Sequence, residues 1–222
     1  MTSVLEAMTA IRNAERRAAE PVELPDASDA GIQLALELRE TQSAGGGRIV
    51  LFVPTLRNTD ASPAACDAVC GLVDLHDGPV LIIDLRARPN RDSTPSWLET
   101  LAAHEQVGTL WGAQTPSDCA VLWRPLAGRT EKAFCAAPDQ LAARLHDARA
   151  RYPYVVCIGD AVPSSMATLM IAGLADGVVL SVPAGRVTKP QVNDVTIQLR
   201  RARATLLGFV VDPRGVSRED QP

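Results

Sequence analysis

The chain has 222 residues, of which 46% are hydrophobic and 22% are charged. This composition suffices for one domain with a substantial core and excludes a disordered chain. The formal net charge is −4, whereas a nucleic-acid-binding domain would be expected to carry a strong basic balance. The basic cluster of Arg200, Arg201 and Arg203 falls where a helix is expected to end, and cations are favourable at that end of a helix. We therefore expect no nucleic-acid partner.

Hydropathy and cysteine content indicate the compartment. The sequence contains no run of about 18 apolar residues that could cross a membrane, and its N-terminus lacks the layout of a signal peptide. Five cysteines without paired CxxC spacing are interpreted as reduced thiols and not as disulfides or metal ligands; they are Cys66, Cys70, Cys119, Cys135 and Cys157. We expect a cytoplasmic protein, with a peripheral place at the inner membrane through a partner as an option that the sequence leaves open.

The chain is expected to form one main domain with short segments at both ends. Residues 1–20 are predicted to form an amphipathic helix, because a Ser-x-x-Glu capping box at Ser3 precedes apolar residues at i, i+4 and i+7. The proline-containing residues 21–28 are interpreted as a linker. Residues 29–215 are assigned to the main domain and residues 216–222 to a flexible tail.

Apolar runs of strand length alternate with helix-period segments along the main domain. The expected strands are Ile49–Val53, Val80–Ile83, Ala120–Trp123, Tyr154–Ile158, Val178–Val182 and Leu206–Val211. The expected helices are Asp29–Thr41, one that starts at Ser62, one near Trp97–Leu101, Pro138–Ala150, Ser165–Leu174 and Thr188–Arg203. This alternation predicts an α/β fold with a doubly wound, mostly parallel sheet and helices on both faces.

The loop after the first expected strand is the natural place for a ligand. In doubly wound sheets, ligands bind at the carboxyl ends of strands, and a helix N-terminus there can hold a phosphate. Residues 54–61 form this loop, and we expect Ser62 to cap the following helix, with Pro63 at its first position. A phosphate-cradling loop needs glycines and a lysine, and this loop contains neither.

Several segments resemble the bacterial capsular and exopolysaccharide tyrosine autokinases (BY-kinases), relatives of MinD and ParA. Val80–Pro89 is similar to the family motif V-L-L-I-D-x-D-L-R-R-P, and Leu174–Val182 to its strand L-A-D-G-V-L-L-V-V. Phe52–Val69 aligns with the family's phosphate-binding loop and the helix after it, and Tyr152–Ala161 with the motif Y-D-Y-V-I-I-D-T-P-P. The resemblance implies a P-loop NTPase-like fold over nearly the whole chain.

The aligned phosphate-binding loop has lost the residues that hold phosphate. The family's two loop glycines fall on Asn58 and Asp60, and its phosphate-binding lysine falls on Ala61. Asp60 would place negative charge where phosphate oxygens should lie, which is unfavourable at short range. Ser62 would be either a remnant Mg²⁺ ligand or a helix cap, and the capping interpretation is favoured.

The other aligned motifs are also incomplete. Asp84 is retained, and its role is either that of a metal or water ligand or that of a carboxylate that caps a neighbouring loop. The second Asp of its motif is replaced or deleted near Arg86. Ile158 stands where the family has its Mg²⁺-linked Asp, and Asp160 lies two residues later. Asp212 stands where the family has an Asn that often lies near the adenine of the bound nucleotide. The resemblance therefore implies a vestigial nucleotide pocket, formed by Asn58, Asp60, Ala61, Ser62, Asp84, Asp160 and Asp212.

These losses favour a BY-kinase-like pseudo-enzyme that regulates or scaffolds exopolysaccharide or capsule synthesis and export. We expect no catalytic residue, no metal site and no cofactor. The resemblance implies two candidate partners: the cytoplasmic segment of a membrane polysaccharide co-polymerase, or an active kinase homologue. It also implies self-association through Gln33–Arg39, which resembles the family's E-x-x-R-x-L-R helix.

Two other hypotheses remain open at this point. One is an active tyrosine kinase or ATPase that binds ATP and Mg²⁺ through an atypical loop, with Asp84, Asp160 and backbone donors around Asn58–Ser62. The other is a MinD/ParA-like positioning protein. Nucleotide binding tests the first hypothesis, and the identity of neighbouring genes separates the second from polysaccharide work.

Overall fold

The computed structural model describes residues 24–40, 47–75, 78–86, 121–125 and 138–212. The predicted N-terminal helix, the predicted helix near Trp97–Leu101 and the predicted tail lie outside these residues. Within the described ranges, no helix has the length and apolar character needed to cross a bilayer.

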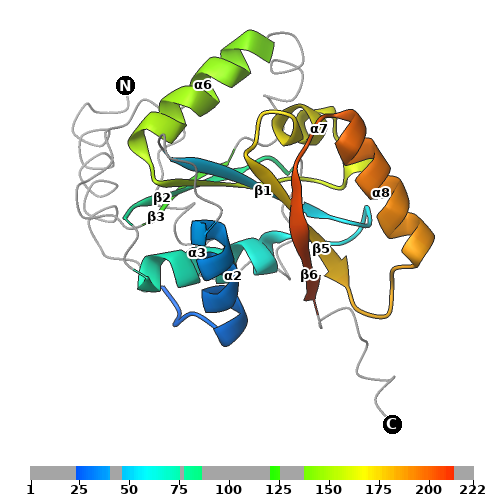
Figure 1. Cartoon of the computed structure of the whole chain (residues 1–222), viewed down its shortest axis with the longest axis horizontal. Coiled ribbons are helices and arrows are strands. Elements are labelled where there is room, and N and C mark those ends of the chain that lie inside the picture. The colour runs from blue at the N-terminus through cyan, green and yellow to red at the C-terminus, as the bar shows by residue number, and fades with distance from the viewer. Residues whose placement is uncertain (1–23, 41–46, 76–77, 87–120, 126–137, 213–222) are drawn as a thin grey trace, which may run out of the picture.

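A parallel sheet forms the centre of the described structure (Figure 1). Its strands are β1 (Arg48–Pro54), β2 (Val80–Asp84), β3 (Val121–Pro125), β4 (Tyr154–Ile158), β5 (Gly177–Pro183) and β6 (Leu206–Asp212). The spatial order is β3-β2-β4-β1-β5-β6, and every neighbouring pair is parallel. The predicted α/β fold with a parallel sheet is confirmed.

Helices cover both faces of this sheet (Figure 1). They are α2 (Asp29–Glu40), α3 (Ser62–Asp74), α6 (Pro138–Arg151), α7 (Met166–Ala172) and α8 (Lys189–Arg201), with a short 3₁₀ turn at Val162–Ser164. Helices α2 and α3 pack on one face, and α6, α7 and α8 pack on the other. The doubly wound arrangement predicted from the alternating pattern is therefore present.

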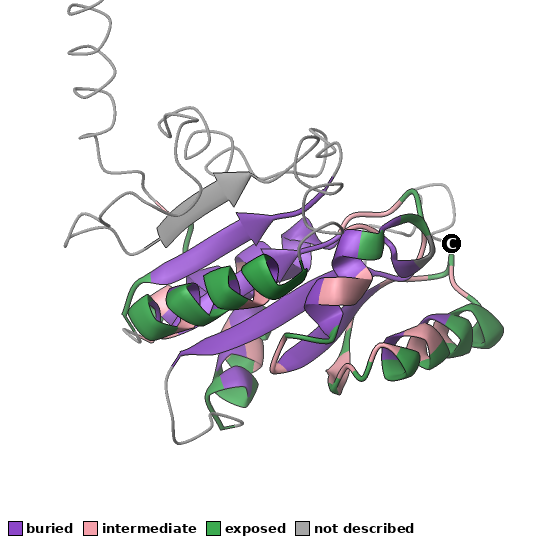
Figure 2. Ribbon diagram, turned by 90° about the horizontal axis from the view of Figure 1, so that it is seen from above, coloured by how far each residue is buried: buried purple, intermediate pink, exposed green. Residues whose placement is uncertain are grey.

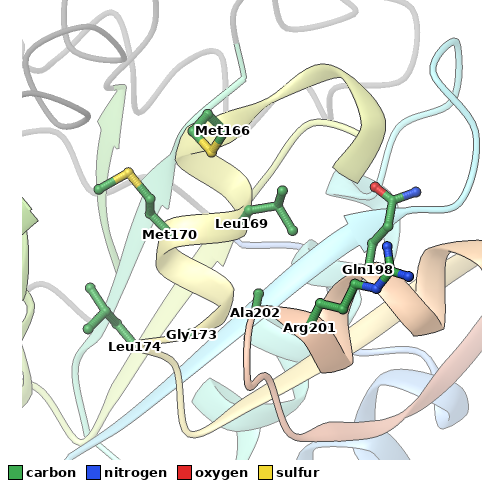
Figure 3. Close-up of a pocket in the computed structure, with 8 residues that line it drawn as sticks. All are labelled: Met166, Leu169, Met170, Gly173, Leu174, Gln198, Arg201 and Ala202. Carbon is green, nitrogen blue, oxygen red and sulfur yellow. The ribbon is translucent and has the colours of Figure 1, made fainter.

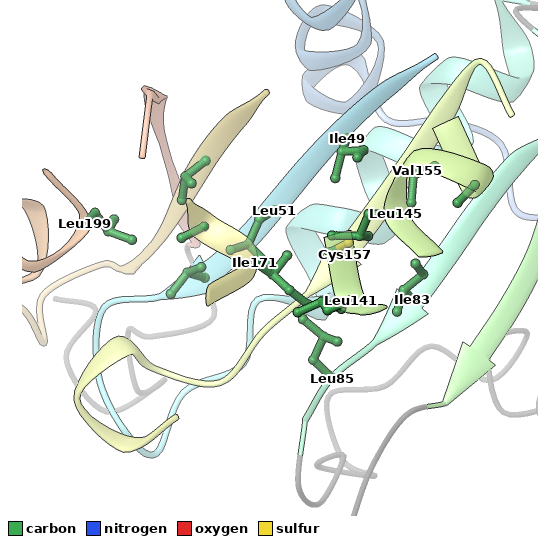
Figure 4. Packing of buried hydrophobic residues seen from close by; sticks show 14 of the residues in the cluster. Ile49, Leu51, Ile83, Leu85, Leu141, Leu145, Val155, Cys157, Ile171 and Leu199 are labelled. Atoms are coloured by element: carbon green, nitrogen blue, oxygen red, sulfur yellow. The ribbon is translucent and has the colours of Figure 1, made fainter. Parts of the chain in front are cut away.

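Burial on both faces explains why the central strands have continuous apolar sequences. Along β1, Val50 and Phe52 contribute to the core beneath α2 and α3, while Ile49, Leu51 and Val53 contribute to the core beneath α6, α7 and α8. Figure 4 shows Leu51 of this second core near Ile171 of the covering layer. Figure 2 shows the central strands fully buried and the outer sides of the helices exposed.

Helix α2 lies unusually close to α3, because glycines stand at their crossing. A Cβ atom added to Gly31 would lie 2.4 Å from the carbonyl oxygen of Asp67, and one added to Gly71 would lie 2.4 Å from the carbonyl oxygen of Gly31. Any larger residue would force the two backbones apart. This contact holds α2 against the helix that begins at the candidate site.

Part of the predicted linker is also attached to α3. The Ala27 N–H donates to Asp74 Oδ2 at 3.1 Å, and Leu24 packs against the core on this face. Ser28 Oγ accepts the Gly31 N–H at 3.0 Å, which satisfies one of the open donors in the first turn of α2. Residues 24–28 therefore connect the start of α2 to the end of α3.

Candidate functional site

The carboxyl ends of three neighbouring strands meet at the candidate site. Ile158, the last residue of β4, lies in register with Phe52 of β1 on one side and with Asp84 of β2 on the other. The loop after β1 runs from this edge of the sheet into α3, whose first residue is Ser62. Residues that follow β1 and β2 are thereby brought together although they are far apart in sequence.

Arg86 lies at the centre of this site. Its Nε donates to Asp84 Oδ1 at 2.8 Å and its Nη2 donates to Asp84 Oδ2 at 2.6 Å, which makes a bidentate pair. Its Nη1 donates to Asp60 Oδ2 at 2.6 Å and also to Ser62 Oγ. The side chains of Arg86, Asp84 and Asp60 are 4%, 2% and 7% exposed, so these ion pairs are almost completely removed from water. We call these four residues the Arg86 cluster.

Asp60 occupies the position at the start of α3 where an anion would bind. Its Oδ1 accepts the backbone N–H of Ser62 at 2.8 Å and also the Ser62 hydroxyl. A carboxylate is favourable at this end of a helix for the same reason that a phosphate is. Pro63 follows and has no N–H to offer. The Asp60 carboxylate therefore accepts an open backbone N–H at the start of α3.

The charges of the cluster hold Arg86 in its protonated form. Burial alone would lower the pKa of Arg86, but the hydrogen bonds and charges of Asp84 and Asp60 more than offset burial, so its pKa is raised above the ordinary value. The guanidinium thus remains charged at every accessible pH. One buried cation faces two carboxylates, and its donors point at oxygen atoms of this chain.

The structure corrects the role predicted for Ser62. The N-cap of α3 is Ala61, and Ser62 is the first helical residue, with Pro63 after it. The capping interpretation was wrong because Asp60, two residues earlier, accepts the open N–H, which leaves the Ser62 hydroxyl to bind Asp60 and Arg86. The sequence pattern Ser-Pro marked the helix start within one residue but not the hydrogen bonds that form it.

Asp84 has both an anticipated contact and an unanticipated one. Its Oδ1 accepts the backbone N–H of Arg86 at 3.1 Å, as expected of a carboxylate that caps the loop after its own strand. Sequence reasoning missed the guanidinium that binds both of its oxygens. The sequence did contain a signal for this contact. Arg86 stands near the position where the aligned family motif has its second Asp. A cation in place of a carboxylate needs acidic partners if it is buried.

The remaining residues of the predicted pocket lie outside the Arg86 cluster. Asn58 is exposed, and Ala61 is fully buried in the core beneath α2 and α3. Asp160 lies two residues beyond β4, and Asp212 is the last residue of β6; both are half-buried, and neither is among the hydrogen-bond partners of Arg86.

Ile158 places an apolar side chain where the aligned kinases have a metal-linked carboxylate. It is fully buried and belongs to the same core cluster as Ala61. Within the described residues, no group of three or more His, Cys, Asp and Glu side chains could hold a metal ion. At the carboxyl end of β2, Asp84 is the aligned carboxylate that remains, and Arg86 binds both of its oxygens.

Comparisons with known proteins bear on the fold. No protein-family model matches the chain, and no curated protein matches it in sequence. The kinase domain of VpsO superposes with a TM-score of 0.60 at 15% identity, over 95% of this chain and 98% of that domain. The kinase domain of the Escherichia coli tyrosine kinase ETK gives a TM-score of 0.58 at 15% identity, over 83% of this chain and 74% of that chain. The chimerical protein CapA2B2 gives 0.55 at 15% identity, over 90% and 97%. The chain therefore has the P-loop NTPase-like α/β fold of bacterial tyrosine-kinase domains.

Proposed function

We propose that this chain is a pseudo-enzyme of the BY-kinase type, which acts by binding another protein in exopolysaccharide or capsule synthesis and export. The observation that supports this proposal is the Arg86 cluster. There the chain's own carboxylate replaces the phosphate, and its own guanidinium replaces the cations that would face that phosphate.

The energetics of phosphoryl transfer support this proposal. Catalysis of that reaction depends almost entirely on positioning and on positive charges that meet the phosphate oxygens. Here Arg86 is already bound by Asp60 and Asp84 at 2.6 Å each. A nucleotide phosphate at the start of α3 would therefore have to compete with Asp60 for the Ser62 N–H and for Arg86.

The biological setting of the proposal comes from the sequence resemblance to BY-kinases, and the likeness to the VpsO and ETK kinase domains is consistent with it. We propose a cytoplasmic protein whose partner is either the cytoplasmic segment of a membrane polysaccharide co-polymerase or an active kinase homologue. In either case this chain contributes a binding surface and no chemistry.

Calorimetric titration tests the proposal directly. ATP and ADP, each with Mg²⁺, are titrated into the purified protein up to millimolar concentration, and we expect no binding heat. An incubation with ATP and Mg²⁺, followed by mass spectrometry, should show no phosphotyrosine. Binding at micromolar nucleotide that is lost in Asp84→Asn would overturn the proposal in favour of an active kinase or ATPase, and so would robust autophosphorylation.

A further inference from the structure

Helices α7 and α8 lie side by side on the face of the sheet opposite α3 (Figure 1). An open apolar groove of about 530 Å³ lies between them (Figure 3). Helix α7 and its end contribute one wall and α8 contributes the other. The groove is lined chiefly by Met166, Leu169, Met170, Leu174, Gln198 and Arg201. None of these residues belongs to the Arg86 cluster, and the proposed loss of nucleotide chemistry makes no use of them.

The backbone closes one end of this groove. At that end Gly173 follows α7, and a Cβ atom added to it would lie 2.7 Å from the carbonyl oxygen of Ala202 at the end of α8. The two chains can approach this closely only because position 173 has no side chain. The end of the groove near Gly173 and Ala202 is therefore set by the main chain.

The α7 wall of the groove presents apolar groups to solvent. Met166 is 59% exposed and Leu174 is 40% exposed, while Leu169 and Met170 are half-buried against the core below. Figure 3 shows Leu169 directed toward α8, across from Gln198. Methionine adapts its shape to a partner, so Met166 and Met170 suit a surface that packs against apolar side chains.

The α8 wall ends in a cluster of cations. Arg200, Arg201 and Arg203 are all exposed, and none of their side chains has an ion pair or hydrogen bond to any residue that the structure describes. Arg201 itself lines the groove. The chain as a whole has a net charge of −4, so this positive cluster contrasts with its average surface. A partner that filled the groove would gain most if it carried carboxylates at this end.

We propose that the α7–α8 groove docks an amphipathic helix of a partner protein, with apolar side chains on α7 and one or two carboxylates facing Arg201. Apolar anchors at i, i+3 or i+4, and i+7 suit such a groove, and the length of α7 sets a contact of about two helical turns. The groove is concave, which favours a helix over a flat bilayer. It is also too open to enclose most of a small molecule, which small-molecule pockets normally do. This inference rests on the proposed function only in taking the occupant to be a protein.

A panel of fluorescent synthetic helical peptides tests the inference on the full chain. Each peptide has about 14 residues, with leucines at i, i+4 and i+7 or at i, i+3 and i+7, and two glutamates at one end. Matched peptides carry lysines in place of the glutamates. Binding is measured by fluorescence anisotropy for the wild type and for Met166→Asp and Arg201→Glu. The matched control is Lys189→Glu, which makes the same charge change on the exposed first turn of α8, outside the groove.

We expect at least one glutamate peptide to bind the wild type, and to bind Met166→Asp and Arg201→Glu at least tenfold more weakly. Lys189→Glu should bind like the wild type, and Arg201→Glu should prefer the lysine peptide. No binding by any glutamate peptide, equal binding of both charge forms, or binding only to phosphatidylglycerol vesicles would overturn the inference. Nucleotide binding would defeat the proposed function but not a positive peptide result. Conversely, an absence of peptide binding would overturn this inference but would not show that the protein binds nucleotide.

Discussion

Arg86 and Arg201 place the same side chain in opposite circumstances. The Arg86 side chain is 4% exposed and is bound by two carboxylates and a hydroxyl of its own chain. Arg201 is exposed at the edge of an apolar groove, without an ion pair to the described residues. A charge satisfied inside the protein has little interaction energy left for a ligand, whereas an exposed charge can gain a partner at little cost. The comparison contrasts a charge that is paired inside the protein, at the carboxyl ends of the strands, with a charge left exposed on the helical face across the sheet.

The strongest test of this contrast removes the buried charge. We expect Arg86→Ala to lower the free energy of unfolding by about 3–5 kcal/mol, because it removes the buried cation that is paired with both Asp60 and Asp84. Urea unfolding followed by circular dichroism measures the change. Arg186→Ala serves as a control, because Arg186 is exposed on the loop after β5, and its effect should stay within about 0.5 kcal/mol.

A compensated variant separates the loss of charge balance from the loss of packing. Replacing all three charges, with Arg86→Met, Asp60→Asn and Asp84→Asn together, should recover part of the stability lost in Arg86→Ala, since no unpaired buried charge remains and Met refills the volume of the arginine side chain. If Arg86→Ala alone costs less than about 1 kcal/mol, the cluster is not the tightly held internal contact described above.

The second test concerns the helix that carries the site. Gly71→Ala should lower the free energy of unfolding by about 1–3 kcal/mol, because its Cβ would meet the carbonyl oxygen of Gly31 at 2.4 Å and push α2 away from α3. Gly208→Ala is a matched control in β6, where an added Cβ meets no atom within 4 Å. The same urea experiment should show no loss for Gly208→Ala, and equal losses for both variants would contradict the close contact of the two helices.

The fold was predictable to the extent that local pattern determines it. The apolar run Tyr154–Ile158 matches β4 residue for residue, and Ile49–Val53 differs from β1 by one residue at each end. Burial on both faces of the sheet makes such runs easy to detect. The strand order could not be read in the same way, because β2 lies beside β4 and β1 lies between β4 and β5 only through long-range packing.

Some residues of the candidate site were predictable, but their arrangement was not. The missing glycines and lysine were visible in residues 54–61, and the predicted pocket included Asp60, Ser62 and Asp84. Their common partner, Arg86, was missed because its pair with Asp60 spans 26 residues and depends on how the chain turns after β2. Sequence patterns along one strand or helix do not describe contacts between two loops.

A third test uses the pH dependence of stability near the site. Cys70 lies on α3, where burial, followed by the charges of Asp67 and Asp74, raises the pKa of its thiol from 9.0 to about 11. A raised pKa in the folded state means that its contribution is fully present below pH 9 and is lost as the pH rises from about 9 toward 11. Each such thiol removes about 1.4 kcal/mol per pH unit in that window.

Comparison of the wild type with Cys70→Ala isolates this effect from the other groups that titrate at high pH. We expect the free energy of unfolding to fall less steeply between pH 9 and pH 10 in the variant, by about 1 kcal/mol over that unit. Unfolding is measured by urea titration at each pH under reducing conditions. Identical slopes would mean that the thiol is more accessible to water than its burial indicates.

The smallest expected effect completes the contrast between the two arginines. Arg201→Ala and Met166→Ala should each change the free energy of unfolding by no more than about 0.5 kcal/mol, because both side chains are exposed and Arg201 has no ion pair to the described residues. The same substitution of arginine by alanine would thus be costly at position 86 and nearly neutral at position 201. A loss above about 1 kcal/mol at Arg201 would show that the groove supports the fold, and its exposed groups could then no longer be taken as reserved for a partner.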